Sequence, residues 1–135
     1  MHRPGQPCLV CHRDGGEGPT FTVAGTVFRD PAGLVPVQDA MVVLIDAMQA
    51  RITATTNCVG NFYLTPRDAS PTLPMWTTVE LGTIRIDMES AMHLDGDCGA
   101  CHGDPVTQAQ AGHVFLTDDP ALIPTVPMAR QSRCD

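Results

Sequence analysis

Two short stretches of the chain combine cysteine and histidine at a spacing that could hold a cofactor. CLVCH covers residues 8–12 and CGACH covers residues 98–102. Each is a Cys-x-x-Cys pair followed at once by histidine, and the segment between them has a different character. Three kinds of chemistry use such pairs: a redox-active dithiol, a zinc site and covalent attachment of haem c.

The first two kinds of site suit this sequence poorly. A thioredoxin-like dithiol uses one Cys-x-x-Cys pair with a helix starting inside the motif. We expect no such helix here, and Gly99 and Gly103 weaken one further. Zinc ribbons keep their two pairs roughly 15 to 20 residues apart, whereas the present pairs lie much farther apart. Strands could still bring the pairs together, but zinc does not require histidine directly after each second cysteine.

Covalent haem c accounts for every fixed position of the two motifs, because Cys-x-x-Cys-His is its attachment signature. Two cysteines on one turn form thioethers with the two vinyl groups of a porphyrin, and the next residue supplies the proximal imidazole to the iron. We therefore predict two haem c groups per chain. The residues assigned to them are Cys8, Cys11 and His12 in the first motif and Cys98, Cys101 and His102 in the second.

The distal iron ligands must come from elsewhere in the chain. Three of the five histidines remain as candidates: His2, His93 and His113. The flanks HRPGQPCLVCH and HLDGDCGACH share a histidine, a glycine three residues later and then the motif, so His2 and His93 have equivalent positions. His113 is the alternative to His2, or an ordinary strand histidine. A methionine such as Met92 could also bind iron.

In these features the chain resembles multihaem c-type cytochromes, in which a histidine just upstream of one motif commonly ligates a different haem of a close pair. The resemblance implies crossed ligation, with His93 on the haem of residues 8–12 and His2 on the haem of residues 98–102. Two bis-histidine haems have no open coordination site, which favours electron transfer over catalysis. An iron without its distal histidine would instead suit a haem enzyme, such as a peroxidase or reductase.

Two cysteines lie outside the motifs, Cys58 and Cys134. An even remainder is consistent with a disulfide formed in an oxidising compartment. An intrachain bond would pin the C-terminal arm to the middle of the chain, and an interchain bond would join neighbours. A free buried thiol is the remaining alternative.

The chain divides into a haem-binding segment at 1–20, a strand-rich segment at 21–88 and a second haem-binding segment with an extended arm at 89–135, forming one compact unit. A helical turn is expected within 89–94, a strand within 111–116 and a tight turn at 57–61, where Asn and Gly gather. Short apolar and alternating runs predict antiparallel strands within 21–28, 41–47, 51–56, 62–65, 76–81 and 83–88.

The stretches TVAGTVF, VPVQDAMVVLID and ITATTNCVGNFYL resemble the carboxypeptidase regulatory-like, or transthyretin-like, β-sandwich family. The resemblance implies a mainly β fold, a Greek-key-like antiparallel sandwich used for adhesion or scaffolding, with the last stretch as a hairpin. Neighbouring edges of such a sandwich could return residues 20 and 89 to one place. The two haems would then form a pair at one end of the β domain.

The composition of the chain argues against some classes of partner, and the motifs indicate in which compartment the protein works. The formal charge of −7 disfavours nucleic acid and anionic lipid, and no apolar run reaches the length of a membrane span. Haem c is attached outside the cytoplasm, so we expect an extracellular, cell-surface or periplasmic protein. The printed sequence shows no signal peptide, which indicates a processed form if the protein is exported.

Two classes of electron-transfer protein remain open. One is a subunit of a self-assembling extracellular cytochrome filament, whose first partner is another copy of the chain. The other is a soluble periplasmic dihaem carrier. Both would exchange electrons with other cytochromes or with extracellular acceptors. We expect the filament, because the proline-rich arm at 117–135 and His2 near the chain end suit contacts between copies.

Overall fold

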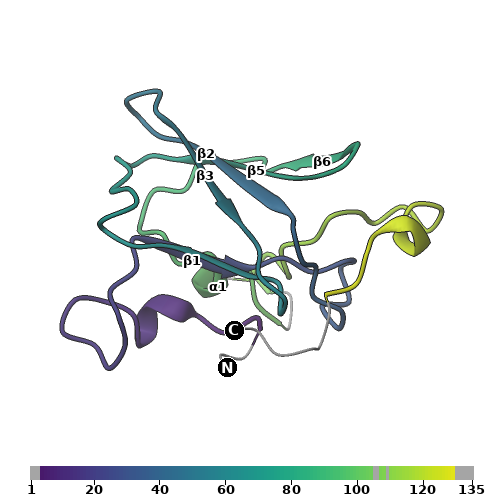
Figure 1. Cartoon of the computed structure of the whole chain (residues 1–135), viewed down its shortest axis with the longest axis horizontal. Coiled ribbons are helices and arrows are strands. Elements are labelled where there is room, and N and C mark those ends of the chain that lie inside the picture. The colour runs from purple at the N-terminus through teal and green to yellow at the C-terminus, as the bar shows by residue number, and fades with distance from the viewer. Residues whose placement is uncertain (1–3, 105–106, 109, 130–135) are drawn as a thin grey trace.

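The structure, a computed structural model, describes residues 4–104, 107–108 and 110–129. Over these ranges the chain is mainly β, with two antiparallel sheets and three short helical turns (Figure 1). None of the helices in the described ranges has the length and hydropathy of a membrane span. The elements in chain order are η1 Cys8–Val10, β1 Val23–Thr26, β2 Met41–Ile45, β3 Arg51–Thr55, β4 Asn61–Leu64, β5 Trp76–Leu81, β6 Ile84–Asp87, α1 Cys98–Cys101 and η2 Ile123–Thr125.

The strands form a four-stranded sheet in the order β3-β2-β5-β6 and a two-stranded sheet of β1 and β4. Each strand lies at the place that the alternating runs predicted, within a residue or two at its ends. The strands predicted within 76–81 and 83–88 form a hairpin around Gly82, since β5 and β6 pair from Leu81–Ile84 to Thr78–Asp87. Gly82 has a φ of +59°, which favours glycine at this tight turn.

The predicted hairpin between β3 and β4 is wrong. β3 pairs with β2, whereas β4 pairs with β1 in the other sheet, so residues 56–60 carry the chain from one sheet to the other. The Asn57 side chain shapes this corner, because its Oδ1 accepts the N–H groups of Val59 and Asn61. β4 therefore pairs with β1, with Phe62 opposite Gly25, and not with β3, the strand that precedes it in the chain.

The core lies where the two sheets face each other in Figure 1. It joins Val23, Phe62 and Leu64 of the two-stranded sheet to Val42, Leu44 and Val79 of the four-stranded sheet. Every residue of β1 is buried. Asp97 bridges to Ala24 along the free edge of β1, and the Gly5 N–H donates to Thr26 Oγ1 at 2.9 Å. Both haem-binding segments predicted from the sequence therefore lie against β1.

The segment after β6 differs in part from its prediction. Residues 89–94 form no helical turn; Met92 makes an antiparallel bridge with Met75. Within 111–116 strand character is limited to a parallel bridge between Phe28 and Phe115.

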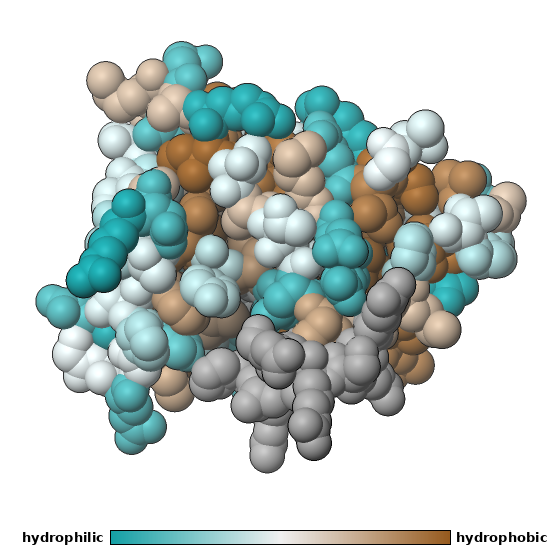
Figure 2. Space-filling model, in the orientation of Figure 1, coloured by the Kyte–Doolittle hydropathy of each residue, from teal (hydrophilic) through white to brown (hydrophobic). Residues whose placement is uncertain are grey.

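The arm is extended only in part, since η2 interrupts it, and its described residues wrap their own domain. Val126 is in the core, the Arg29 Nε–H donates to the Ile123 carbonyl at 2.8 Å, and the Ala129 N–H donates to the Pro36 carbonyl. Figure 2 shows apolar side chains at the surface around this arm, where Leu122 is exposed. A groove of about 300 Å³ lies between β6 and the arm, lined by Thr83, Ile84, Arg85, Ile86, Leu116, Thr117, Asp118 and Leu122.

Candidate functional site

The two Cys-x-x-Cys-His motifs lie side by side, although they are about ninety residues apart in the chain. The Asp97 carboxylate, next to the second motif, accepts the N–H groups of Cys8 and Leu9 at 3.1 and 3.0 Å. Gly99 packs so closely that a Cβ there would lie 2.6 Å from the carbonyl oxygen of Gln6. The fold therefore brings into contact two motifs that the strand-rich segment separates in the sequence.

Each motif forms one helical turn, in contrast to the expectation that neither starts a helix. In the first motif the N–H groups of Cys11 and His12 both donate to the carbonyl of Cys8. In the second, the His102 N–H donates to the carbonyl of Cys98 at 2.8 Å, and α1 ends at Cys101. Positions three and four residues apart are neighbours on a helical turn, so this backbone conformation keeps the two cysteines and the histidine of each motif close together.

The imidazole of His12 is held on three sides. Its Nδ1 is 2.8 Å from the carbonyl oxygen of Pro19, and its ring stacks on Phe21 with centroids 4.1 Å apart and planes 7° apart. Gly18 covers the ring, since a Cβ at Gly18 would lie 2.5 Å from His12 Cε1. Phe21 in turn stacks on the half-exposed Tyr63 at 4.5 Å.

The imidazole of His102 has a corresponding partner. Its Nδ1 is 2.9 Å from the carbonyl oxygen of Gly112. The Ala111 N–H donates to the carbonyl of Cys101 at 2.8 Å, which fixes this strip of chain behind the motif.

The two carbonyl contacts decide the tautomer of both histidines. A carbonyl oxygen only accepts hydrogen bonds, so Nδ1 of His12 and of His102 must carry the proton. In the neutral ring the lone pair then belongs to Nε2. Histidines that bind metals show this arrangement, with the second ring nitrogen donating to a carbonyl or carboxylate. Neither Pro19 nor Gly112 was predicted from the sequence.

The first cysteine of each motif is shielded and the second is exposed. Burial, reinforced by the charge of Asp97, raises the pKa of the Cys8 thiol to about 11 and that of the Cys98 thiol to about 12. Reactive dithiols and zinc thiolates need the opposite shift. Cys11 and Cys101 are exposed, and all four are free thiols. Among the described residues no three His, Cys, Asp or Glu side chains converge as a metal cluster.

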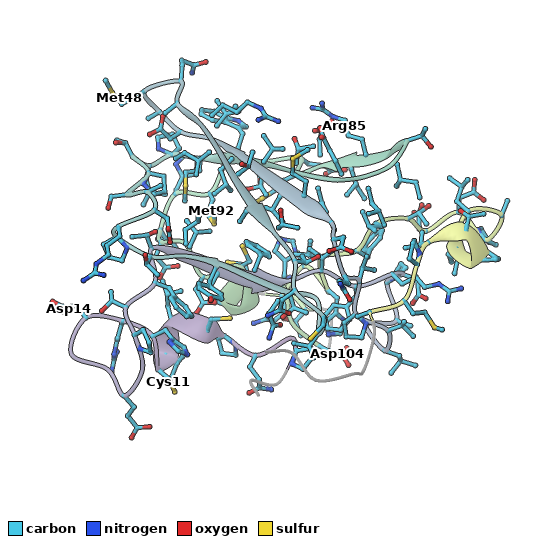
Figure 3. The ribbon with its side chains drawn as sticks, in the orientation of Figure 1. Cys11, Asp14, Met48, Arg85, Met92 and Asp104 are labelled. Atoms are coloured by element: carbon cyan, nitrogen blue, oxygen red, sulfur yellow. The ribbon has the colours of Figure 1, made fainter. Side chains whose placement is uncertain are left out.

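A cavity of about 300 Å³ adjoins the first motif, near Cys11 in Figure 3. The cysteines and histidine of that motif form one wall, and aromatic and aliphatic side chains form most of the others. The size and lining suit the insertion of one edge of a flat apolar group next to the Cys-x-x-Cys turn. Its lining residues are Pro7, Cys8, Cys11, His12, Phe21, Ala24, Asn57, Val59, Asn61, Phe62 and Tyr63.

The second motif is more enclosed. Cys98 belongs to the core and lies against β1, where a Cβ at Gly25 would be 2.8 Å from the Cβ of Cys98. Cys101, by contrast, is at the surface, and His102 is half-buried.

The predicted distal ligands are placed as follows. His93 is exposed, between the Met75–Met92 bridge and the turn at α1. His113 packs edge-on against Phe28, with ring centroids 4.8 Å apart, and follows the Gly112 carbonyl on the Nδ1 side of His102. The ring contact with Phe28 is of the kind that a packing residue makes. His2 lies outside the described residues.

The predicted disulfide is described at one of its two cysteines. Cys58 is disulfide-bonded, whereas its predicted partner, Cys134, lies outside the described residues.

Comparison of the chain with protein-family models, with curated proteins and with solved structures found no match. The geometry of the two motifs is therefore the basis on which a function can be argued.

Proposed function

We propose that this protein is a dihaem c-type cytochrome that transfers electrons. The observation that carries the proposal is the pair of Nδ1 contacts, from His12 to the Pro19 carbonyl and from His102 to the Gly112 carbonyl. In the neutral ring each contact leaves the lone pair on Nε2 and orients the ring next to a Cys-x-x-Cys turn. Two histidines ninety residues apart share this arrangement, which ordinary surface histidines do not need.

The surrounding residues support haem as the group that is held. When bound, haem c supplies one-electron chemistry at its iron. Cys8 and Cys11 would tether one haem, and His12 Nε2 would bind its iron, with Phe21 fixing the plane of the ring. The apolar cavity at this motif would exclude water from the porphyrin edge. At the other motif the corresponding groups are Cys98, Cys101 and His102.

The contact between the motifs supports exchange of electrons within the chain. Haems tethered on touching turns are close neighbours, which favours fast transfer between them. The distal ligands proposed from the sequence are His93 for the haem of residues 8–12 and His2 for the haem of residues 98–102. With both positions filled, neither iron would bind a substrate, which favours a carrier over a peroxidase or reductase.

Haem content tests this proposal directly. We expect the pyridine haemochrome assay to give two haems c per chain, retained after denaturation because they are covalent, with both irons low-spin in the oxidised protein. The paired variants Cys8→Ala/Cys11→Ala and Cys98→Ala/Cys101→Ala should each keep one haem. Purification with zinc and without haem from a host that attaches haem c would refute the proposal, and a high-spin iron would favour an enzyme.

We also propose that the two antiparallel sheets are the halves of a Greek-key-like β-sandwich of the carboxypeptidase regulatory-like kind. The shared core between the sheets and the cross-over from β3 to β4 support this assignment. Residues 21–88 would form this body, with the segments 1–20 and 89–135 carrying the haems. The bonded Cys58 suits an oxidising, extracellular or periplasmic location.

Assembly into a conductive filament is the form of this function that we favour. The described arm does not support it, because residues 117–129 bind their own domain. The supporting observation is His93, which is exposed and therefore accessible to a second copy. A monomeric periplasmic dihaem carrier is the alternative.

A further inference from the structure

Asp97 connects the two motifs more directly than any other described side chain. Its Oδ1 accepts the Cys8 N–H at 3.1 Å and its Oδ2 accepts the Leu9 N–H at 3.0 Å. Only 5% of the residue is exposed. Two accepted N–H bonds favour the ionised form of this carboxyl group. In that form Asp97 places a buried negative charge where the two motifs meet.

The first motif depends on this contact for its own turn. The first N–H groups of a helical turn have no partner within it and need a capping acceptor. Pro7 precedes η1 and has no polar side chain, and η1 receives no side-chain cap from that position. Asp97 supplies the missing acceptor from the second motif, although it stands at the start of α1.

Asp97 is itself held in place by β1 and by its own loop. The Ala24 N–H donates to the Gly96 carbonyl at 2.9 Å, in the bridge that pairs Ala24 with Asp97. The Asp97 N–H donates to Asp95 Oδ1 at 2.9 Å. The sheet therefore holds the carboxylate in place, and the carboxylate in turn holds residues 8–9 through its two hydrogen bonds.

The charge of Asp97 reaches both motifs. Burial raises the pKa of Asp97, the N–H groups of Leu9 and Cys8 lower it, and the nearby charge of Asp95 raises it. After burial, the charge of Asp97 is the next cause of the raised pKa of both the Cys8 and the Cys98 thiol. The ionisable groups that face it are thus Cys8, Cys98 and Asp95, none of which supplies a positive charge.

We propose that Asp97 is a positioning residue that locks the two haem-binding turns together, and that its buried charge stabilises the oxidised state of both haems. Because the charge acts on haem, this second effect rests on the function proposed above. Reduction adds an electron, so a fixed negative charge nearby lowers the midpoint potential. The low dielectric around a buried carboxylate makes the effect larger than that of an exposed one.

Three single substitutions separate this role from a general effect of charge. Asp97→Asn removes the charge and keeps one acceptor oxygen, whereas Asp14→Asn and Asp104→Asn each remove an exposed charge beside one motif. We expect Asp97→Asn to shift both midpoint potentials upward in spectroelectrochemical titration. Each control should shift at most one potential, and by less, because water screens it.

Amide hydrogen exchange gives a second readout that does not depend on redox chemistry. In the full-length protein we expect the Cys8 and Leu9 amides to exchange faster in Asp97→Asn, and fastest in Asp97→Ala. The two controls should leave these rates unchanged. If Asp97→Ala does not fold, the Asn variant decides the comparison.

The outcomes are distinct. Two haems in the wild type with both potentials unchanged in Asp97→Asn would overturn the electrostatic role and leave the proposed function standing. Unchanged exchange at residues 8–9 would overturn the positioning role. A wild type without haem would overturn the proposed function and the electrostatic role together, while the exchange rates would still decide the positioning role.

Discussion

His12 owes its fixed orientation to three neighbours that differ in chemistry. The Pro19 carbonyl fixes the tautomer, Phe21 fixes the plane of the ring, and Gly18 leaves room for it. An iron ligand must keep both its lone pair and its ring plane in place, because small rotations change overlap with the metal. The surroundings of His12 therefore matter as much as the residue.

Gly18→Ala tests whether this orientation is needed. A Cβ at Gly18 would lie 2.5 Å from His12 Cε1 and 2.6 Å from Nδ1, so the ring must move or the loop must open. We expect one haem per chain to be lost or to show altered g-values in electron paramagnetic resonance. Gly103→Ala is the matched control, because its Cβ meets only the end of the Gln110 side chain, which can swing away. Equal spectra for the two variants would contradict the prediction.

The sequence predicts His12 and His102 as proximal ligands, but it does not predict the carbonyl groups that orient their rings. Spacing alone assigns His12 and His102, since each directly follows a cysteine pair. The carbonyl acceptors lie 7 and 10 residues farther along, in loops, and follow no common spacing. The role of Asp97 depends on two segments meeting across β1. Only the folded chain reveals such contacts.

Among the elements, each strand was predictable because alternation and β-branched runs are local signals. The partner of β4 was not, because Asn57 and Gly60 permit either a hairpin or a corner between sheets. The corner forms since Phe62 and Leu64 of β4 are buried against the core when they pair with β1. Burial of the whole set of apolar side chains thus overrides the local turn signal.

The connection from β2 to β3 shows how one carboxylate holds an element in place. Asp46 is buried, its Oδ1 accepts the N–H groups of Met48 and Ala50, and its Oδ2 accepts that of Thr72. The hydrogen bonds from Thr72, then Ala50, are the main causes of the lowered pKa of Asp46. The residue therefore closes a turn and ties it to the loop before β5.

The lowered pKa of Asp46 gives a pH prediction with a defined sign. A carboxyl group whose pKa is lower in the folded state stabilises the fold above its unfolded pKa, and the contribution is lost as the pH falls through the folded value. We expect chemical unfolding to show a steep loss of stability below about pH 4. In Asp46→Asn this loss should be shallower, with lower stability at pH 7.

Asp68→Asn provides the comparison for Asp46. The pKa of Asp68 is also lowered, by hydrogen bonds from Thr65, but the residue caps an exposed local turn. Its substitution should change the acid limb less, because solvent competes for those bonds. Equal pH profiles for Asp46→Asn and the wild type would show that the turn does not contribute to acid stability.

For the molecule as a whole, the β body serves to bring together two motifs that the sequence separates. Residues 5–10 lie against β1, and residues 96–98 lie along its free edge (Figure 1). Two motifs on either side of an inserted domain can form one site only if the chain before the domain and the chain after it lie together. The return of residues 20 and 89 to one place stays a prediction from the family resemblance, whereas the hydrogen bonds from Cys8 and Leu9 to Asp97 could not be predicted from the sequence.

The source of the distal ligands decides whether the whole molecule works alone or in an assembly. His93 is exposed, so it could bind an iron in its own chain or in a neighbour, and the prediction from the sequence leaves both possibilities open for His2. If His2 acts on a neighbour, as we expect for a filament, His2→Ala should break assemblies and leave one haem per chain high-spin. If it acts within the chain, the spin state should change without any change in size.

Light scattering and negative-stain microscopy of native material measure the size of the assemblies, and electron paramagnetic resonance of the same sample measures the spin state of the haems. His113→Ala is the matched control, because the His113 ring packs on Phe28. This variant should keep both haems low-spin and leave the size distribution unchanged. Native material that is monomeric with two low-spin haems would contradict the filament and support the soluble carrier. In that case both distal ligands must come from within one chain.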